Sequence, residues 1–129
     1  MALRDTLKVM VVDDMSVSRG LIVQSLEEIG VWNTTTENNG HAALARLIVN
    51  PVHLVLSDMN MPVMDGLGLL KGLREHRMTS KIGFILITGT PSPQIAQRGQ
   101  DLRMNNLVAK PFTSGILASA IERVVGKLG

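Results

Sequence analysis

The chain has 129 residues, the size of one domain, and contains no cysteine, so disulfide bonds, thiolate metal sites and cysteine nucleophiles are excluded. Its net charge of +2 comes from 13 basic and 11 acidic residues that form no long run of one sign, which argues against a nucleic-acid-binding arm. No apolar stretch approaches the length of a membrane span, and no signal-peptide core is present. We expect a soluble, cytoplasmic monomer that binds neither nucleic acid nor a membrane.

Short apolar runs alternate along the chain with amphipathic patterns. The runs predict buried or half-buried strands, because they are rich in β-branched and aliphatic residues and stop at turn signals. The predicted strands cover residues 8–12, 31–36, 54–58, 82–87 and 106–109. The predicted helices cover residues 17–29 after an N-cap at Ser16, 41–49, 66–75, 94–102 and, after an N-cap at Thr113 or Ser114, residues up to 128. Residues 1–5 are expected to lead directly into the first strand.

The regular alternation predicts one α/β domain over residues 1–129, with no linker, no repeat and no output domain. Right-handed crossovers that each carry a helix give a three-layer α/β/α arrangement, a parallel sheet covered on both sides by five helices. Alternation alone does not fix the strand order. The flavodoxin-like order 2-1-3-4-5 suits five strands, and it places the active crevice over the ends of the first, third and neighbouring strands.

Polar side chains stand where four of these strands end. Asp13 and Asp14 follow the first strand, Asp58 closes the third, and Thr88 and Lys110 follow the fourth and fifth. Each alone has an ordinary explanation, such as a solvated strand end, a capping hydroxyl or a surface cation, but in the order 2-1-3-4-5 all five meet in one crevice. Three close carboxylates need a compensating cation, and hard oxygen ligands suit Mg²⁺. A carboxylate beside Mg²⁺, an ammonium and a hydroxyl is a phosphoryl-acceptor arrangement.

Four motifs identify a family resemblance that covers essentially the whole chain. They are Val11-Val12-Asp13-Asp14, Ser57-Asp58-Met59-Asn60-Met61-Pro62 with Met64-Asp65-Gly66, Ile87-Thr88-Gly89 and Lys110-Pro111-Phe112. In this order and at these separations, the chain resembles a response-regulator receiver domain, and most of all the stand-alone chemotaxis regulators of the CheY type. The resemblance implies the CheY-like fold and a role in two-component signalling.

The resemblance also implies roles for the strand-end residues. Asp58 would accept a phosphoryl group from a histidine kinase or a small phosphodonor. Asp14, Asp58 and the backbone carbonyl of Asn60 would bind Mg²⁺, with Asp13 acting through water. Lys110 would contact the phosphoryl oxygens.

A second set of implied roles concerns the switch. The Lys110–Pro111 peptide bond would be cis, and Thr88 would move toward the phosphoryl group and signal to the output face made by helix 94–102, strand 106–109 and the last helix. The family's switch aromatic falls on Leu107, and the chain contains no tyrosine. Leucine cannot make the polar contact of a tyrosine, so coupling between Thr88 and the output face must differ or be weaker.

We therefore expect a phosphorylation-controlled protein-binding switch, with self-catalysed phosphotransfer and autodephosphorylation but no turnover enzyme activity. The expected partners are a histidine kinase, a downstream protein such as the flagellar switch, and a phosphatase. A phosphate sink or phosphorelay shuttle is the alternative that the missing aromatic favours. An aspartate-nucleophile phosphatase would need Asp-x-Asp after the first strand, a spacing that residues 13–16 lack. A flavodoxin would need a phosphate-binding loop there, where two aspartates would instead repel the phosphate.

Overall fold

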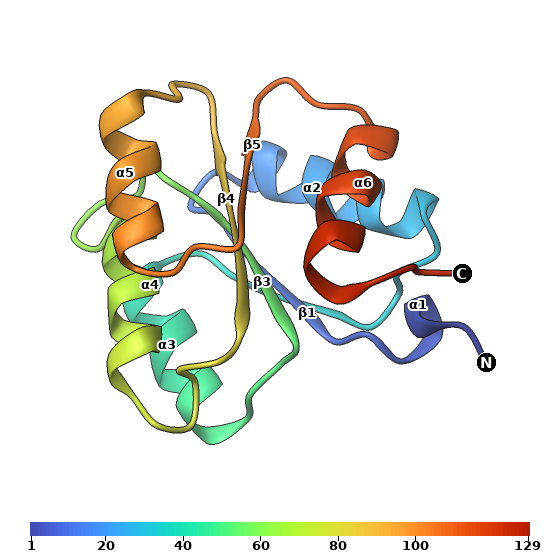
Figure 1. Ribbon diagram of the computed structural model, residues 1–129, viewed down its shortest axis with the longest axis horizontal. Helices are drawn as coiled ribbons and strands as arrows, with labels where there is room; N and C mark the ends of the chain where they lie inside the picture. Colours follow the sequence, from blue (N-terminus) through green and yellow to red (C-terminus); the bar gives the residue numbers. More distant parts are fainter.

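The structure, a computed structural model, describes residues 1–129. Its centre is a parallel sheet of five strands in the order β2-β1-β3-β4-β5, as predicted. The strands are β1 (Val9–Val12), β2 (Thr34–Glu37), β3 (Leu54–Asp58), β4 (Gly83–Thr88) and β5 (Asn106–Ala109). The helices are α1 (Leu3–Thr6), α2 (Ser16–Glu28), α3 (Gly40–Val49), α4 (Gly66–Glu75), α5 (Pro93–Asp101) and α6 (Ser114–Val125). Figure 1 shows α2 and α6 on one side of the sheet and α3, α4 and α5 on the other.

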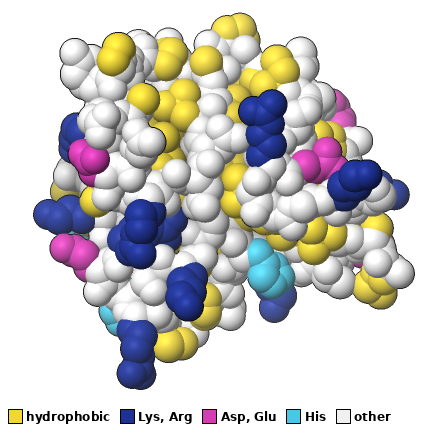
Figure 2. Space-filling model, viewed as in Figure 1, with side chains coloured by type: hydrophobic (Ala, Val, Ile, Leu, Met, Phe, Trp, Pro, Cys, Tyr) yellow, Lys and Arg dark blue, Asp and Glu magenta, His cyan; other side chains and the backbone are white.

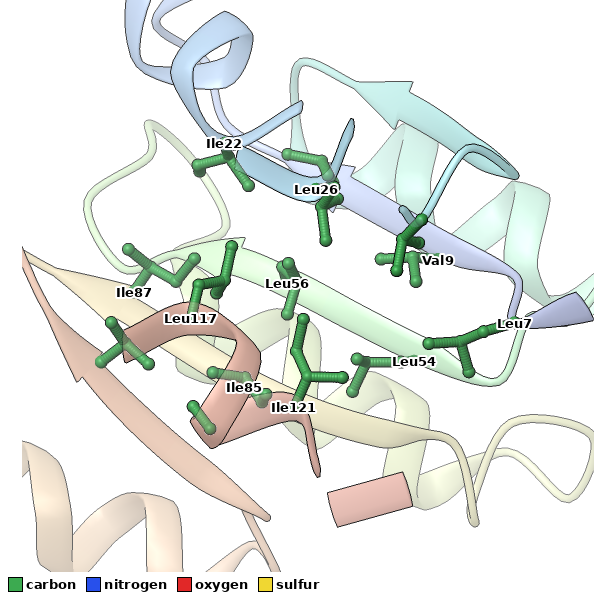
Figure 3. Close-up of a cluster of buried hydrophobic side chains, with 14 of the residues drawn as sticks. Leu7, Val9, Ile22, Leu26, Leu54, Leu56, Ile85, Ile87, Leu117 and Ile121 are labelled. Carbon is green, nitrogen blue, oxygen red and sulfur yellow. The ribbon is translucent and has the colours of Figure 1, made fainter. Parts of the chain in front are cut away.

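The sheet separates two hydrophobic cores because successive strand residues point to opposite faces. One core of 15 buried residues lies between the sheet and α2 and α6. Figure 3 shows Leu54, Leu56 and Ile85 of the sheet facing Ile22 of α2 and Ile121 of α6. The other core has 14 buried residues and packs against α3 and α4. Helices cover both faces of the sheet, which explains why the sequences of the central strands are continuous apolar runs.

Four local predictions were wrong. The last helix, predicted to reach residue 128, ends at Val125, before Gly126 with its positive φ of 97°. The chain has six helices rather than five, because residues 3–6 form the single turn α1, closed by a hydrogen bond from the Ala2 nitrogen to Asp5 Oδ2 (3.1 Å). Strand β2 begins at Thr34 instead of residue 31, since Val31 is buried in the turn after α2, where its nitrogen donates to the Leu26 carbonyl. Ser16 is the first residue of α2 and not its N-cap.

A half-buried guanidinium ties α4 to the loop that precedes β5. Arg74 donates to the carbonyls of Ser80, Ile82, Leu102 and Arg103 and to the Asn105 side chain, at 2.8 to 3.2 Å. Desolvation by burial, and to a smaller degree the nearby charge of Arg103, hold the pKa of Arg74 below its ordinary value. These bonds satisfy loop carbonyls that are not paired within the sheet.

No helix of the chain is both long and apolar enough to cross a membrane.

Candidate functional site

Three aspartates lie together at the carboxyl edge of the sheet. Asp13 and Asp14 directly follow β1, and Asp58 is the last residue of β3. The two strands end level, because Val12 pairs with Ser57 in the parallel register. Carboxylate oxygens of all three aspartates lie within 4.8 Å of one another. The structure thus brings together the three carboxylates that the sequence predicts at one edge.

The turn after β3 is held tightly against the strand. The Met59 nitrogen donates to the Ile87 carbonyl of β4 (3.1 Å), and the Gly66 nitrogen donates to the Met59 carbonyl (2.9 Å). A Cβ atom on Gly66 would lie 2.5 Å from the Asp58 carbonyl oxygen, a distance that no side chain tolerates. Asp65 then caps α4 by accepting a hydrogen bond from a backbone N–H of its first turn. Glycine at position 66 allows α4 to begin directly behind Asp58.

Lys110 brings a balancing charge into the acidic cluster. Its Nζ lies 2.9 Å from Asp58 Oδ1, to which it donates, and 3.7 Å from Asp13 Oδ2. The backbone nitrogen of Lys110 donates to the Thr88 carbonyl (2.9 Å), and this bond fixes the point where the chain leaves β5. The Lys110–Pro111 peptide bond is cis, the isomer that the resemblance implies. One ammonium faces three carboxylates, so the cluster carries an excess of negative charge at neutral pH.

Two residues of α2 complete the site, and sequence reasoning missed both. The Ser18 hydroxyl donates to Asp13 Oδ2 (2.5 Å) and accepts a hydrogen bond from Lys110 Nζ (2.8 Å). Arg19 Nη1 donates to the Asp13 carbonyl (2.8 Å). Ser18 lies 92 residues from Lys110 in the sequence, so no local pattern links the two. The sequence feature that could have identified Ser18 is its position in the first turn of α2, a helix that starts at the crevice.

Thr88 and Asn60 lie at the same edge of the sheet. Thr88 closes β4 and is buried; its Oγ1 accepts a hydrogen bond from the Thr90 nitrogen (3.1 Å) and lies 3.4 Å from the Thr90 hydroxyl. This places the Thr88 hydroxyl against the loop that leads to α5. Asn60 is exposed and stands two residues after Asp58, and its carbonyl remains a predicted metal ligand.

Leu107 lies away from the acidic cluster, on the middle of β5. It pairs with Leu86 of β4 and packs, half-buried, against the core under α3 and α4. Its other side lines a groove of about 500 Å³ together with Ile116 and Arg123 of α6. Figure 2 views the face that carries α5, β5 and α6, with hydrophobic side chains between the two helices and separate Lys and Arg side chains around them. Leu107 therefore belongs to the predicted output face.

Sequence comparison identifies the family. The family model described as the response regulator receiver domain matches residues 9–122, which include the three aspartates, Thr88 and Lys110. The chain belongs to the response-regulator receiver family. The resemblance drawn from its motifs is confirmed.

Named relatives of this receiver domain are chemotaxis proteins. It is 38% identical over 128 residues to the probable chemotaxis protein CheY of Rhizobium etli, covering 99% of each chain. It is 28% identical over 126 residues to chemotaxis protein CheY-3 of Vibrio cholerae, covering 98% of this chain and 97% of the relative. The solved structure of V. cholerae CheY4 matches with a TM-score of 0.84 at 29% identity, covering 92% and 98% of the two chains. The receiver domain is thus of the chemotaxis type, with the flavodoxin-like fold of CheY.

The donor set of the receiver domain fits a hard divalent cation. Asp13 is completely buried and Asp58 is 6% exposed, so most of the screening that water gives to exposed carboxylates is absent. Asp14 Oδ1 is buried and has no hydrogen-bond partner, which is costly for a charged oxygen unless a ligand binds it. Oxygen ligands that leave room for several waters are the preference of Mg²⁺.

Proposed function

We propose that this receiver domain accepts a phosphoryl group on Asp58, with Mg²⁺ bound at the acidic cluster, and that phosphorylation changes which protein its output face binds. The observation that carries the proposal is the contact between Lys110 Nζ and Asp58 Oδ1, at 2.9 Å within a cluster of three carboxylates. The ammonium stands where charge on the transferring oxygens would need compensation. The donor would be the phosphohistidine of a histidine kinase or a small acyl phosphate.

The transfer step uses side chains that the fold already holds in place. An Asp58 oxygen forms a bond to phosphorus, the bond between phosphorus and the leaving atom breaks, and its electron pair departs with the donor. Asp58 Oδ2 accepts no hydrogen bond from the protein, whereas Oδ1 accepts one from Lys110, so one oxygen is free to attack. The Lys110 ammonium would then contact the phosphoryl oxygens, which carry the negative charge after the transfer. Asp14, Asp58 and the Asn60 carbonyl would hold Mg²⁺, with Asp13 acting through water; bound Mg²⁺ supplies further charge compensation.

The proposed route to the output face runs through Thr88 and the strand that it closes. Thr88 pairs with Ala109 of β5, two residues beyond Leu107, and its hydroxyl contacts the loop before α5. A movement of this hydroxyl toward a phosphoryl group would release the Thr90 contact and alter the α5–β5–α6 face. The relatives named as chemotaxis proteins support a downstream partner in the flagellar switch. We expect autodephosphorylation, with or without a partner phosphatase, and no other catalytic turnover.

Leu107 supports a second candidate function, a phosphate sink or phosphorelay shuttle. An aliphatic side chain half-buried in β5 lacks the hydroxyl that would report its position to solvent and to a partner. A sink needs rapid phosphoryl exchange with a kinase but no change at the output face. Partner binding therefore separates the two functions.

Removal of the metal is expected to stop phosphoryl uptake. Wild-type protein treated with acetyl phosphate and Mg²⁺ should gain the mass of one phosphoryl group, observed by intact-mass spectrometry and lost again on standing. With a chelator in place of Mg²⁺, the uptake rate should fall by roughly a hundredfold or more, because the excess negative charge of the cluster then opposes the incoming anion. Equal labelling with and without Mg²⁺ would contradict the proposed role of the acidic cluster.

Binding to a flagellar-switch peptide is expected to depend on phosphorylation if the domain is a motor effector. We expect the affinity, measured by fluorescence anisotropy of the labelled peptide, to rise by about 5- to 50-fold on phosphorylation, which lies within the range that ordinary coupling energies produce. An affinity that ignores phosphorylation would remove the effector function. Phosphotransfer from a kinase that then proceeds within seconds would favour the sink.

A further inference from the structure

The Ser18 hydroxyl stands between the two opposite charges of the site. Ser18 is the third residue of α2 and is partly buried. It donates to Asp13 Oδ2 at 2.5 Å and accepts from Lys110 Nζ at 2.8 Å. The direct distance from Lys110 Nζ to the same Asp13 oxygen is 3.7 Å, beyond hydrogen-bond reach. A neutral hydroxyl therefore separates the ammonium from Asp13.

Both oxygens of Asp13 are oriented by the start of α2. Oδ1 accepts a hydrogen bond from the Met15 nitrogen (2.9 Å), and Oδ2 accepts the one from Ser18. Each carboxylate oxygen has two lone pairs, so each keeps one for a cation or its waters. Asp13 is held in this orientation without any direct hydrogen bond from Lys110.

Without the Ser18 hydroxyl, Lys110 would lose one of its two hydrogen-bond acceptors. The nearest replacement is Asp13 Oδ2, which would have lost its donor at the same time. A lysine side chain has four flexible carbons and a compact charge, so a small shift would bring the ammonium into direct contact with Asp13. In that position Lys110 would compete with a divalent cation at Asp13, and its contact with Asp58 would be shared or lost.

We propose that Ser18 is a positioning residue that holds the Lys110 ammonium on Asp58 and keeps it off Asp13. Its effect on cation binding follows from the geometry of the cluster alone, whereas its effect on phosphoryl uptake rests on the proposed function. Ser18 touches neither the transferring group nor Asp58 in this arrangement. It acts through Lys110, and this dependence makes the proposal testable.

The test is a double-mutant cycle on Mg²⁺ affinity, measured by titration calorimetry. It compares wild type, Ser18→Ala, Lys110→Met and the double variant. Ser18→Ala is expected to weaken Mg²⁺ binding about 3- to 10-fold in the wild-type background, and by less than about twofold in Lys110→Met, where no ammonium can move onto Asp13. Alanine favours the helix, so folding of α2 is retained. Ser18→Thr keeps the hydroxyl and should bind Mg²⁺ like wild type, and so should Ser16→Ala, which changes an exposed serine two residues earlier.

An equal loss of Mg²⁺ affinity in both backgrounds would overturn the proposal, since Ser18 would then act on Asp13 alone. No loss in Ser18→Ala would overturn it too. The acetyl phosphate labelling rate is measured on the same variants and should follow the same pattern. If wild type is labelled but the Mg²⁺ cycle shows no coupling, the inference about Ser18 fails and the proposed function stands. If the cycle shows coupling but wild type is never labelled, the proposed function fails and the positioning role of Ser18 stands.

Discussion

Asp58→Asn is expected to abolish phosphoryl uptake. The substitution replaces the carboxylate oxygen that would attack phosphorus with an amide, which is neutral and a far weaker nucleophile. Loss of a nucleophile typically lowers rates by roughly a thousandfold or more, so labelling with acetyl phosphate and Mg²⁺ should fall below detection by intact-mass spectrometry. The substitution removes the Lys110 contact of a buried carboxylate, but it also removes one of three carboxylates that repel one another, and the two effects oppose each other. The variant should therefore fold like wild type.

The matched control is Asp101→Asn. Asp101 ends α5, is exposed, and accepts only a side-chain hydrogen bond from Gln97. The Asp101→Asn variant carries the same chemical change at a site remote from the acidic cluster, and its labelling should equal that of wild type. Labelling of Asp58→Asn at the wild-type rate would mean that another residue is the acceptor.

Gly66→Val is expected to destabilise the fold and to displace Asp58. A Cβ atom at this position would lie 2.5 Å from the Asp58 carbonyl oxygen and 3.0 Å from the Met59 Cα. Both atoms belong to the backbone, which cannot rotate out of the way as a flexible side chain does. Overpacking of this kind costs about 3 kcal/mol, measured as a lower urea midpoint in chemical denaturation. Because the clash falls on Asp58 itself, the labelling rate of the folded fraction should fall as well.

Gly20→Ala provides the opposite case. Gly20 lies inside α2, and a Cβ atom there would meet no atom within 4 Å. Alanine in a helix interior is favoured over glycine by about 0.5 to 1 kcal/mol, so this variant should be slightly more stable than wild type and label normally. A Gly66→Val protein as stable as wild type would show that the turn after β3 has more freedom than the structure indicates.

The sequence predicted the strands that carry the site because each is a buried run stopped by polar residues. Asp58 at the end of β3 and Lys110 after β5 could be located from that pattern alone, and parallel pairing then brings their ends to one edge. Strand β2 was predicted three residues early because Val31 is β-branched and apolar, like a strand residue. Its burial in the turn after α2 depends on packing that a local pattern does not contain.

Ser18 shows which part of the site could not be predicted from the sequence. Serine at the start of a helix is common as a cap, and Ser16 fitted that pattern better than Ser18 did. The role of Ser18 depends on where the Lys110 side chain reaches after the chain has crossed the sheet, and no periodicity encodes that. The helix α1 escaped prediction for a related reason, since a single turn closed by Asp5 is too short to show periodicity.

Locating the modified residue tests whether Asp58 carries the phosphoryl group. An acyl phosphate on aspartate is reduced by borohydride to homoserine, whereas phosphate esters of serine and threonine are not. Wild-type protein labelled with acetyl phosphate and Mg²⁺ is reduced, digested and sequenced by mass spectrometry. We expect homoserine at position 58 and at no other aspartate. Homoserine at Asp13 or Asp14, or at no position in a protein that carries a phosphoryl group, would contradict it.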